Sequence, residues 1–473
     1  MGSEWKDVGL EQIATFRNGA GVKQIHFANE GIPLARVSDF TMDSIDLADP
    51  KFVEINHAQL WRSHFIKEGD VIVATVGSWP PNWSSVVGKV VRAPKQATGV
   101  IQNQNSCCIQ AKPEALDKRF LFFRLKHGDF AWHAANNAGG SANQARLPVK
   151  KIGMFSLKLP PLPEQKAIAH ILGSLDDKIE LNRRMNATLE GMAQALFKSW
   201  FVDFDPVIDN ALAAGNPIPD ALAARAEVRR KALADGSANR EAAKPFPAAF
   251  QPTESMGWIP EGWEEKPIVQ IAEKIAMGPF GSRITRDNFV EEGVPVIRGG
   301  NLTNGFVDKN FVYLTDEKAS ELQSANVFPD DIIFTHRGTI GQVGIIPRKS
   351  VHDRYVVSQS QMFLRVNQEI TTPSFAHNYF KFGCGMQRLL CYASQVGVPA
   401  IARPTTSLKS LPILLPNKVV ISEFTQVDAI YENKVIACKE NIEVLTKLRD
   451  TLLPKLISGE LRVPEAEKIA SKA

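Results

Sequence analysis

The stretch Trp5-Lys-Asp-Val-Gly-Leu-Glu-Gln-Ile-Ala14 decides the fold, because it returns later in the chain as Trp263-Glu-Glu-Lys-Pro-Ile-Val-Gln-Ile-Ala272. A second pair follows at nearly the same offset, where Gly31-Ile-Pro-Leu-Ala-Arg36 matches Gly293-Val-Pro-Val-Ile-Arg298. This offset is far longer than the period of a solenoid repeat. The sequence therefore predicts that one whole domain is used twice.

Two further matches extend the repeat. Glu68-Gly-Asp70 and Pro329-Asp-Asp331 each precede three apolar residues, which predicts a turn that feeds a buried strand. Leu157-Lys-Leu-Pro160 matches Ile413-Leu-Leu-Pro416, and each leads into a helical pattern. Four ordered matches at nearly constant offset favour a duplicated unit of a domain followed by a helix.

Composition is consistent with a multidomain globular protein. The chain has 473 residues, of which 44% are hydrophobic, so two or three domains are expected. A net charge of +4 is too small to indicate a nucleic-acid partner by itself. The five cysteines form no CxxC pair, so we expect neither a metal site nor a disulfide framework. We find no signal segment and no run of 18 apolar residues, and we expect a cytoplasmic protein.

Each copy is followed by a long amphipathic pattern of about 28 residues, on the order of 40 Å as a helix. Such a helix needs its apolar stripe covered, and the other helix is the obvious partner. Two copies of a domain-then-helix unit predict an antiparallel pair, in which Asn182 and Asn186 would fix the register. The alternative is that each helix packs only on its own domain. The expected pairing residues are Ile179, Leu189, Leu196, Val435, Ile442, Leu445 and Leu452, with Leu448 or Arg449 at one further position.

Between the first helix and the second copy lies an alanine-rich stretch. Residues 221–234 predict a short surface helix, flanked by turn signals at Gly215-Asn-Pro217 and Asp235-Gly236. Its basic run Arg229-Arg230-Lys231 is interpreted as a solvated face. We therefore interpret the region as a linker with local structure.

Three strings in the chain are similar to those of a known family. They are Leu159-Pro-Pro-Leu-Pro-Glu-Gln-Lys-Ala-Ile-Ala-His-Ile-Leu172, Gly257-Trp-Ile-Pro-Glu-Gly-Trp263 and Arg449-Asp-Thr-Leu-Leu-Pro-Lys-Leu-Ile-Ser-Gly-Glu-Leu461. In order and spacing they resemble type I restriction-modification specificity subunits. One departure is that the second helix opens with Pro416-Asn-Lys-Val-Val-Ile-Ser-Glu-Phe424, which keeps only Glu423 of the proline and Glu-Gln signature.

The resemblance implies an α+β fold with two tandem mixed α/β target-recognition domains. Long helices would separate these domains and pair as an antiparallel coiled coil with a pseudo-two-fold axis. The implied boundaries are 1–158 for the first recognition domain, 159–204 for the central conserved helical region, 205–256 for the linker, 257–415 for the second recognition domain, and 416–473 for the C-terminal conserved helical region.

The resemblance also implies a non-catalytic subunit that binds double-stranded DNA at a split sequence, one half for each domain. It would recruit methyltransferase (M) and restriction (R) subunits, with no membrane partner. S-adenosylmethionine, ATP and Mg would be bound by those partner subunits and not by this chain. Glu164, Gln165 and Glu423 are the implied subunit contacts, and Gln165 would lack a symmetric mate.

Catalytic motifs are missing from the sequence itself. The nearest string to an amino-methyltransferase motif, Pro80-Pro-Asn-Trp83, has the wrong order. Gly278 and Gly281 do not form a dinucleotide loop, and no phosphate-binding GxxxxGK[ST] loop occurs. The pair Asp330-Asp331 could suggest a nuclease, but its counterpart Gly69-Asp70 favours a structural turn. A nucleic-acid enzyme with an unrecognised site and a tandem protein-interaction module remain as alternatives.

Bases are distinguished in the major groove by arginine, by amide side chains and by small hydroxyls. Loops rich in these types stand out in both copies, and Gln104 and Gln361 are expected at nearly equivalent positions. The alternative is that many of these residues are turn residues or buried polar groups. The DNA-binding candidates are Arg36, Ser38, Trp79, Asn82, Gln102, Asn103, Gln104, Asn143, Gln144 and Arg146 in the first copy, and Arg298, Asn301, His336, Arg337, Thr339, Ser358, Gln359 and Gln361 in the second.

Overall fold

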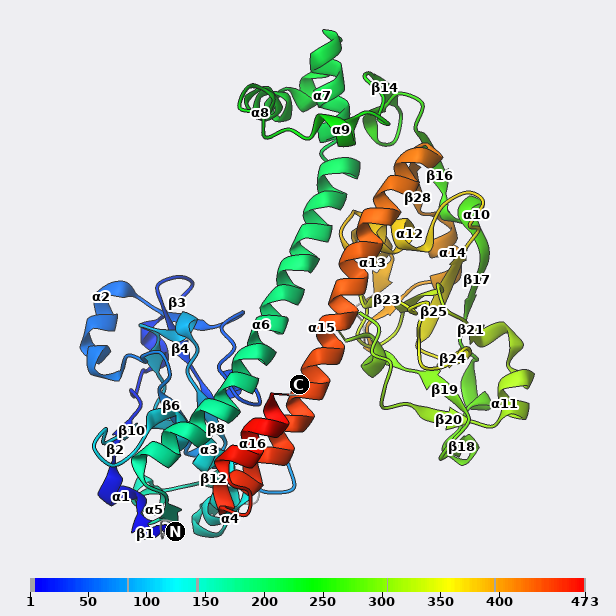
Figure 1. Cartoon of the computed structure of the whole chain (residues 1–473). Coiled ribbons are helices and arrows are strands. Elements are labelled where there is room, and N and C mark those ends of the chain that lie inside the picture. The colour runs from blue at the N-terminus through cyan, green and yellow to red at the C-terminus, as the bar shows by residue number, and fades with distance from the viewer. Residues whose placement is uncertain (1–4, 83–84, 142–143, 304, 395–396, 472–473) are drawn as a thin grey trace. The chain divides into compact units, whose positions relative to one another are not determined.

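The computed structural model describes residues 5–82, 85–141, 144–303, 305–394 and 397–471. The chain divides into two compact units. Unit 1 combines Met1–Arg184 with Cys438–Ala473, and unit 2 is Met185–Ala437. Figure 1 shows that each unit contains one mixed domain of helices and sheets together with a part of each of two long helices.

The domain of unit 1 contains two four-stranded sheets. All neighbours in the first sheet are antiparallel, whereas the second sheet contains one parallel pair, β4 with β9. The first has the order β2 (Ala14–Asn18), β10 (Ser106–Ala111), β6 (Val71–Ala74), β8 (Val90–Arg92), and the second β3 (Phe27–Ala28), β5 (Lys51–Val53), β4 (Ile32–Ala35), β9 (Ile101–Gln102). Smaller pairings join β1 (Lys6–Gly9) to β13 (Ser156–Leu159), and β11 (Gly139–Ser141) to β12 (Gln144–Arg146) and β7 (Val76–Gly77).

The domain of unit 2 repeats the strand order of both sheets and adds one edge strand to the second sheet, which confirms the duplication expected from the sequence. Its sheets are β17 (Ala272–Met277), β25 (Gln361–Val366), β22 (Ile332–Thr335), β23 (Val343–Ile345), and β18 (Phe289–Val290), β20 (Val312–Leu314), β19 (Val294–Ile297), β24 (Tyr355–Val357), β21 (Asn326–Val327). Again one pair, β19 with β24, is parallel. The smaller pairings are β16 (Glu264–Pro267) with β28 (Pro412–Leu415), and β26 (Ala393–Ser394) with β27 (Ala400–Ile401).

The repeated turn before β6 and β22 has the same geometry in both units. Gly69 and Asp330 both have φ +74°, in the left-handed region. The next residue caps the turn in each case: Asp70 accepts from the N–H of Lys67 at 3.0 Å, and Asp331 from that of Phe328 at 2.9 Å. Asp331 is buried and also binds Arg365 through both of its carboxylate oxygens. The acidic pair is therefore structural, as its sequence counterpart suggested.

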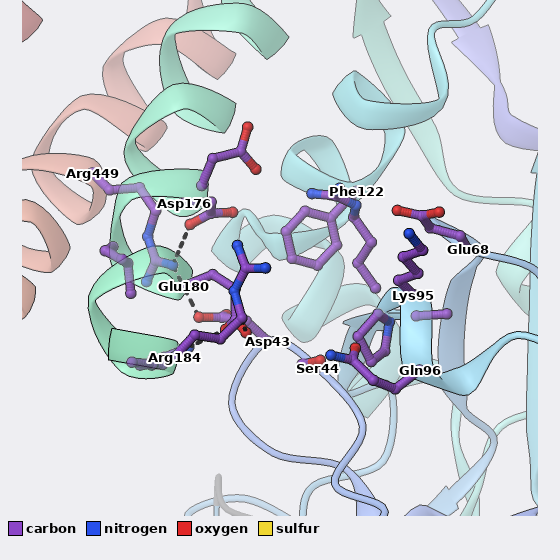
Figure 2. Close-up of a pocket in the computed structure, with 16 residues that line it drawn as sticks. Asp43, Ser44, Glu68, Lys95, Gln96, Phe122, Asp176, Glu180, Arg184 and Arg449 are labelled. Carbon is purple, nitrogen blue, oxygen red and sulfur yellow. Dashed lines mark hydrogen bonds and ion pairs between the residues drawn. The ribbon is translucent and has the colours of Figure 1, made fainter. Parts of the chain in front are cut away.

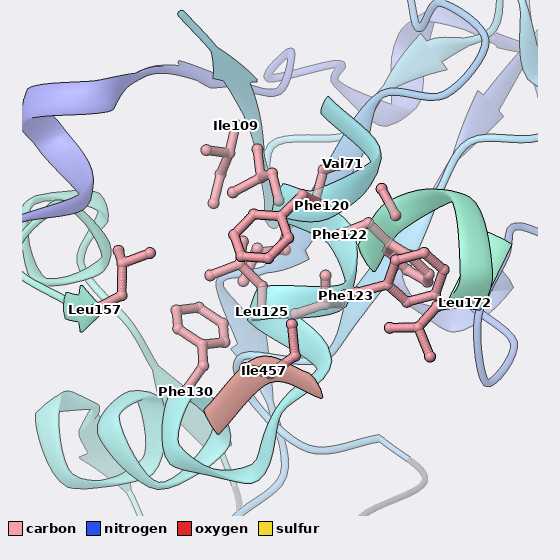
Figure 3. Close-up of a cluster of buried hydrophobic side chains, with 14 of the residues drawn as sticks. Val71, Ile109, Phe120, Phe122, Phe123, Leu125, Phe130, Leu157, Leu172 and Ile457 are labelled. Atoms are coloured by element: carbon pink, nitrogen blue, oxygen red, sulfur yellow. The ribbon is translucent and has the colours of Figure 1, made fainter. Parts of the chain in front are cut away.

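The core of unit 1 is built around helix α3 (Lys118–Lys126). Asp117 caps this helix by accepting from the N–H groups of Arg119 and Phe120 at 2.9 and 2.8 Å. The run Phe120–Leu125 is entirely buried, because it lies between the first sheet and the long helices. Figure 3 shows Phe123 beside Leu172 of the first long helix, and Ile457 of the second near Leu125 and Phe130.

The long helices exceed the expected length. Helix α6 (Leu162–Phe201) has 40 residues and α15 (Lys418–Ser458) has 41. Within unit 1, Glu164 near the start of α6 lies 3.8 Å from Arg462, which follows the end of α15. Asp176, farther along α6, lies 2.7 Å from Arg449 of α15, so the two helices run in opposite directions. The antiparallel sense is confirmed there. In unit 2, the end of α6 packs against Phe424, near the start of α15.

The long helices pack both on each other and on the domains, so both expected modes of packing occur. The apolar clusters that join the helices also contain residues of the domains. Asn182 donates to the carbonyl of Lys178 at 2.8 Å, within its own helix, so it does not bridge to α15. Of the expected pairing residues, Ile179, Leu445 and Leu452 are buried, whereas Leu189, Leu196, Val435 and Ile442 are half-buried.

The sequence left open whether Leu448 or Arg449 occupies one of the helix-pairing positions. Arg449 is the buried residue of the two. Figure 2 shows its guanidinium between two carboxylates, Asp43 from the domain at 2.9 Å and Asp176 from α6 at 2.7 Å. Burial disfavours its charge, but the carboxylates outweigh this effect and hold the pKa of Arg449 above its ordinary value. One buried arginine thus links both helices to the domain of unit 1.

The segment expected to be a linker is folded, and it belongs to unit 2. Arg225 binds Asp205 at 2.7 and 2.6 Å, and Arg229 binds Asp209 at 2.8 and 2.6 Å. Arg229 therefore faces the interior with 16% of its side chain exposed, which corrects its interpretation as part of a solvated face. The segment comprises α7 (Asp205–Ala214), α8 (Ala223–Ala234), α9 (Arg240–Ala243) and β14 (Phe250–Thr253), which pairs with β15 (Gly257–Pro260) just beyond it.

All five cysteines are free thiols. Burial raises the pKa of Cys107 and of Cys108 to about 12, so neither thiol ionises readily. Within the described residues, no group of three or more potential metal-ligand side chains is found. In the same part of the chain, none of the helices has the length and apolar character needed to span a bilayer.

Candidate nucleic-acid interface

Two polar loops meet at one edge of the domain in unit 1. The central loop, residues 103–105, joins β9 to β10, and the hairpin loop, residues 139–146, contains β11 and β12. Thr75 connects them through its backbone. Its N–H donates to the carbonyl of Asn105 at 2.9 Å, and its carbonyl accepts from the N–H of Leu147 at 2.8 Å.

The same arrangement occurs in unit 2. Here the central loop is residues 358–360, between β24 and β25, and the hairpin loop is residues 393–401, with β26 and β27. His336 takes the place of Thr75. Its N–H donates to the carbonyl of Ser360 at 2.9 Å, and its carbonyl accepts from the N–H of Ile401 at 2.8 Å. Equivalent backbone bonds therefore bring two loops together in both units.

An arginine stands at the end of the neighbouring strand in each unit. The N–H of Asn103 donates to the carbonyl of Ala35, just before Arg36, and the N–H of Ser358 donates to that of Ile297, just before Arg298. Both bonds are 3.0 Å long. The parallel pairs β4 with β9 and β19 with β24 thus place each arginine beside its central loop.

This register corrects one expected equivalence. Because Asn103 matches Ser358, the counterpart of Gln104 is Gln359, and Gln361 matches Ser106. The carbonyls of Ser106 and Gln361 accept the equivalent bonds from Gly19 and Gly278, which supports the same alignment. The sequence overlay was wrong by two residues, because identical residue types were matched without the strand pairing.

Two of the candidate glutamines are buried and structural. Gln102, at the end of β9, donates to the carbonyl and the hydroxyl of Ser106 at 3.1 and 3.2 Å. Gln361, at the start of β25, contacts Ser358 across the same turn. Their exposed fractions are 1% and 0%, so neither amide is presented to a ligand in this conformation.

Other candidates of unit 1 are held in different ways. The side chain of Asn103 accepts from the N–H of Asn105 at 3.1 Å, which stabilises the central loop. The indole of half-buried Trp79 donates to the carbonyl of Ser141 at 2.9 Å, so it supports the hairpin loop. Arg36 is half-buried, and the exposed candidates are Ser38, Asn82, Gln104, Gln144 and Arg146. Asn143, like the neighbouring loop residue Trp83, lies outside the described residues.

In unit 2, two candidates belong to the interior. Asn301 is 3% exposed, and its amide donates to the carbonyls of Val307 and Lys309 at 3.3 and 2.9 Å. His336 is 6% exposed, and burial lowers its pKa, which favours the neutral imidazole. Ser358 is half-buried, and the exposed candidates are Arg298, Arg337, Thr339 and Gln359.

A hollow lies beside the central loop of unit 2, and several of the residues that line it were not among the candidates chosen from the sequence. The hollow has a volume of about 280 Å³. It is lined by the candidates Arg298, Ser358 and Gln359, together with Pro279 and Phe289 among other residues. Phe280, next to Pro279, is 73% exposed. The string Gly278-Pro-Phe-Gly281 was visible in the sequence, but an exposed phenylalanine cannot be recognised without the fold.

The implied subunit contacts have three different environments. Gln165 is fully buried, accepts from the N–H of Asp117 at 2.9 Å and donates to the carbonyls of Ala115 and Pro160. Its expected role at a partner surface is therefore corrected, because the amide joins α6 to the domain. Glu164 is half-buried and accepts from the indole of Trp5 at 3.2 Å, while Glu423 is exposed.

Comparison with known proteins agrees with this geometry. A family model described as the type I restriction modification DNA specificity domain matches residues 2–191 and 260–439, leaving 192–259 unmatched. The HindI specificity subunit of Haemophilus influenzae, a type I restriction enzyme subunit, is 28% identical over 429 residues, covering 84% of this chain and 87% of that protein. The EcoBI specificity subunit of Escherichia coli is 22% identical over 471 residues, covering 97% and 86%.

A solved structure supports the fold. The crystal structure of the type I restriction-modification system S subunit from M. genitalium has a TM-score of 0.52 at 13% identity and covers 96% of both chains. The two matched segments of the family model include the two domains and their paired loops, and together they span well over half of the chain. The chain therefore belongs to the type I restriction-modification DNA specificity family, and it is a specificity subunit that recognises a DNA sequence.

Proposed function

We propose that the two domains read the two halves of a split DNA sequence, one half each. The observation that carries this proposal is the repeated pair of loops, which equivalent backbone bonds hold together in both units. A repeated scaffold with different exposed side chains is suited to reading two different half-sites. The same scaffold sets the position of the loops, and the side chains set the sequence.

The exposed residue types fit the edges of bases in the major groove. Gln104, Gln144 and Arg146 are exposed in unit 1, whereas Arg298 and Gln359 are exposed in unit 2. Amide side chains pair with adenine, and arginine pairs with guanine. Because the exposed side chains differ between the units, the two half-sites should differ in sequence.

Catalysis is proposed to reside in partner subunits. The residues of the paired loops are mainly amides, arginines and hydroxyls, which select bases but do not by themselves activate water. The acidic pair Asp330-Asp331 is used by a structural turn. S-adenosylmethionine, ATP and Mg would accordingly be bound by methyltransferase and restriction subunits.

The long helices are the proposed assembly surface for those subunits. Apolar side chains on a helix surface favour a protein partner when they recur along it. Glu423 is exposed near the start of α15. The exposed apolar residues of the two helices include Leu181, Met185 and Met192 of α6, and Val419, Ile430 and Val444 of α15.

Domain exchange tests the division of labour. Residues 1–158 would be replaced by the equivalent domain of a relative that retains an aspartate at position 43, so that Arg449 keeps its partner. Methylome sequencing of cells that also produce the methyltransferase subunit should show one changed half-site and one unchanged half-site. The reciprocal exchange of residues 257–415 is the matched control and should change only the other half. A change of both halves in either exchange contradicts independent reading.

A further inference from the structure

The arginines beside the two central loops are capped by different residues. In each unit, the backbone N–H of the arginine donates to a side chain three residues later. Arg36 donates to the carboxylate of Asp39 at 2.8 Å, and Arg298 to the amide oxygen of Asn301 at 3.1 Å. The backbone is therefore held alike, but only the first arginine has an acidic residue beside it.

In unit 1, the acidic cap also binds the arginine side chain. The Nε and Nη2 groups of Arg36 donate to the two oxygens of Asp39 at 3.1 and 2.8 Å. Ser38 donates to the same carboxylate at 3.0 Å. This bidentate pair neutralises the guanidinium and occupies one edge of its fork.

Unit 2 excludes a carboxylate at the equivalent position. Asn301 is buried, and its Nδ2 group donates to the carbonyls of Val307 and Lys309. A carboxylate has no proton to donate to these carbonyls, so the loop requires an amide. Arg298 consequently remains exposed, and no ion pair to it is found in the described part of the chain.

Arg298 stands at the edge of the hollow of about 280 Å³. Ile284, Phe289 and Val296 contribute an apolar lining, and none of the described residues that line the hollow is acidic. The hydroxyl of Ser358 is turned toward Gln361. Among the described residues that line the hollow, the guanidinium of Arg298 is thus the one charged group, and it stands beside an apolar wall.

We propose that Arg298 reads a guanine in the half-site of the second domain, with two of its N–H groups donating to O6 and N7. This inference rests on the proposed function. Guanine is the base whose major-groove edge offers two adjacent acceptors, and these match the spacing of the guanidinium fork. Arg36 has one edge of its fork held by Asp39, so the two half-sites are read by different chemistry.

The test uses the complex of the full chain with its methyltransferase subunits and a competition assay on duplexes that vary at every position. The exchange of residues 257–415 first assigns one half-site to the second domain. Arg298→Met should reduce the preference for guanine over adenine at one position of that half-site by about 10- to 100-fold, and Arg298→Lys should reduce it by less, because an ammonium group can still donate to O6 and N7. The lysine variant keeps the charge but lacks the fork, so its salt dependence should stay near that of the unmodified complex.

Arg348→Met is the matched control, because it also removes one cation from unit 2 and Arg348 pairs with Asp330. It should leave every base preference unchanged. Arg298→Met could instead lower the affinity for all duplexes equally and reduce by about one the slope of log affinity against log salt concentration. That result would identify a phosphate contact and overturn the guanine proposal. Unchanged preferences in both Arg298 variants would also overturn it. A parent complex without any sequence preference would instead overturn the proposed function.

Discussion

Unit 1 adds a buried ion-pair cluster to the apolar contacts between its domain and the long helices, whereas the joint of unit 2 is made mainly of aromatic rings. The helix joint of unit 1 is the ion-pair cluster of Arg449 with Asp43 and Asp176. In the helix joint of unit 2, Phe201 lies 4.9 Å from Phe375 and 5.1 Å from Phe424, measured between ring centroids. The same duplicated fold therefore allows two kinds of contact between a domain and the long helices. Either kind is stable if apolar side chains cover the helix face or if its buried charges are paired.

The carboxylates of the two joints also differ. Asp43 is held by two cations, Arg449 and Lys126, at 2.9 and 2.8 Å. In unit 2, the buried carboxylate of Asp428 receives hydrogen bonds from Ser374 and Asn378 at 2.5 and 2.9 Å. Burial raises the pKa of Asp428, whereas the cations outweigh burial and lower the pKa of Asp43. Substitution of these two residues should therefore have effects of opposite sign.

The largest effect is expected from Phe424→Ala. The ring is fully buried among other aromatic rings, so its removal leaves a cavity and should cost about 3–5 kcal/mol of unfolding free energy. Chemical denaturation of the full chain measures the loss, and high salt should not change it. Phe424→Leu is the conservative control and should lose much less. A loss below about 1 kcal/mol would mean that the rings do not determine the joint of unit 2.

Arg449→Met should cost about 3 kcal/mol at neutral pH, because it leaves buried carboxylates without their shared cation. The folded pKa of Asp43 is below its ordinary value of 3.8, so its contribution is present above that pH and is lost as pH falls through the lower folded value. Burial raises the pKa of Asp176, for which Arg449 is the one ion-pair partner among the described residues, so this group contributes in the opposite direction. Denaturation from pH 7 to 3 should show the cost of the substitution shrinking below about pH 4.

Arg183→Met is the matched control for that measurement. Arg183 lies on α6 in the same unit, and its ion pair with Glu180 is 3.9 Å long and exposed. Its loss should change stability by less than about 0.5 kcal/mol. Equal losses in the two variants would show that the buried network adds nothing beyond a surface pair.

The smallest effect is a gain. Asp428→Asn should stabilise the chain by about 1 kcal/mol at pH 7, the scale of a typical point substitution. The folded pKa of Asp428 is above 3.8, so its ionisation costs stability as pH rises through that window, and the amide avoids this cost. Below pH 3.8 both states are protonated, and the gain should vanish. Asp43→Asn at pH 7 is the paired measurement and should destabilise the chain. If Asp428→Asn destabilised the chain at pH 7, the two carboxylates would not have effects of opposite sign, and the expectation would be wrong.

The features that could be predicted from the sequence are those that depend on a few consecutive residues. The turn at Gly69-Asp70 and Asp330-Asp331, the repeated strands and the two long helices each leave a signature within a few consecutive residues. The sense of the helix pair followed from the order of the duplicated units. Helix length was underestimated, because α6 continues through an aromatic segment, Phe197–Phe201, that buries its face in unit 2.

The burial of individual polar side chains could not be predicted. Gln102 and Gln104 are two residues apart and chemically identical, yet one is buried against Ser106 and the other is exposed. That difference depends on which strand lies beside them, and a single sequence does not show strand pairing. Arg229 was misinterpreted for a related reason, because its partner Asp209 lies on a neighbouring helix.

The discontinuity of unit 1 has a consequence for synthesis. During translation, the first domain emerges from the ribosome long before Cys438–Ala473, the segment that completes the same unit, is synthesised. Until then, Leu172 and Ile179 lack the covering that Leu445 and Leu452 later help to provide. A chain cut short by a damaged message therefore carries the paired loops of unit 1 together with an uncovered apolar surface, which chaperones and proteases recognise. Synthesis of Cys438–Ala473 thus covers this apolar surface and completes unit 1.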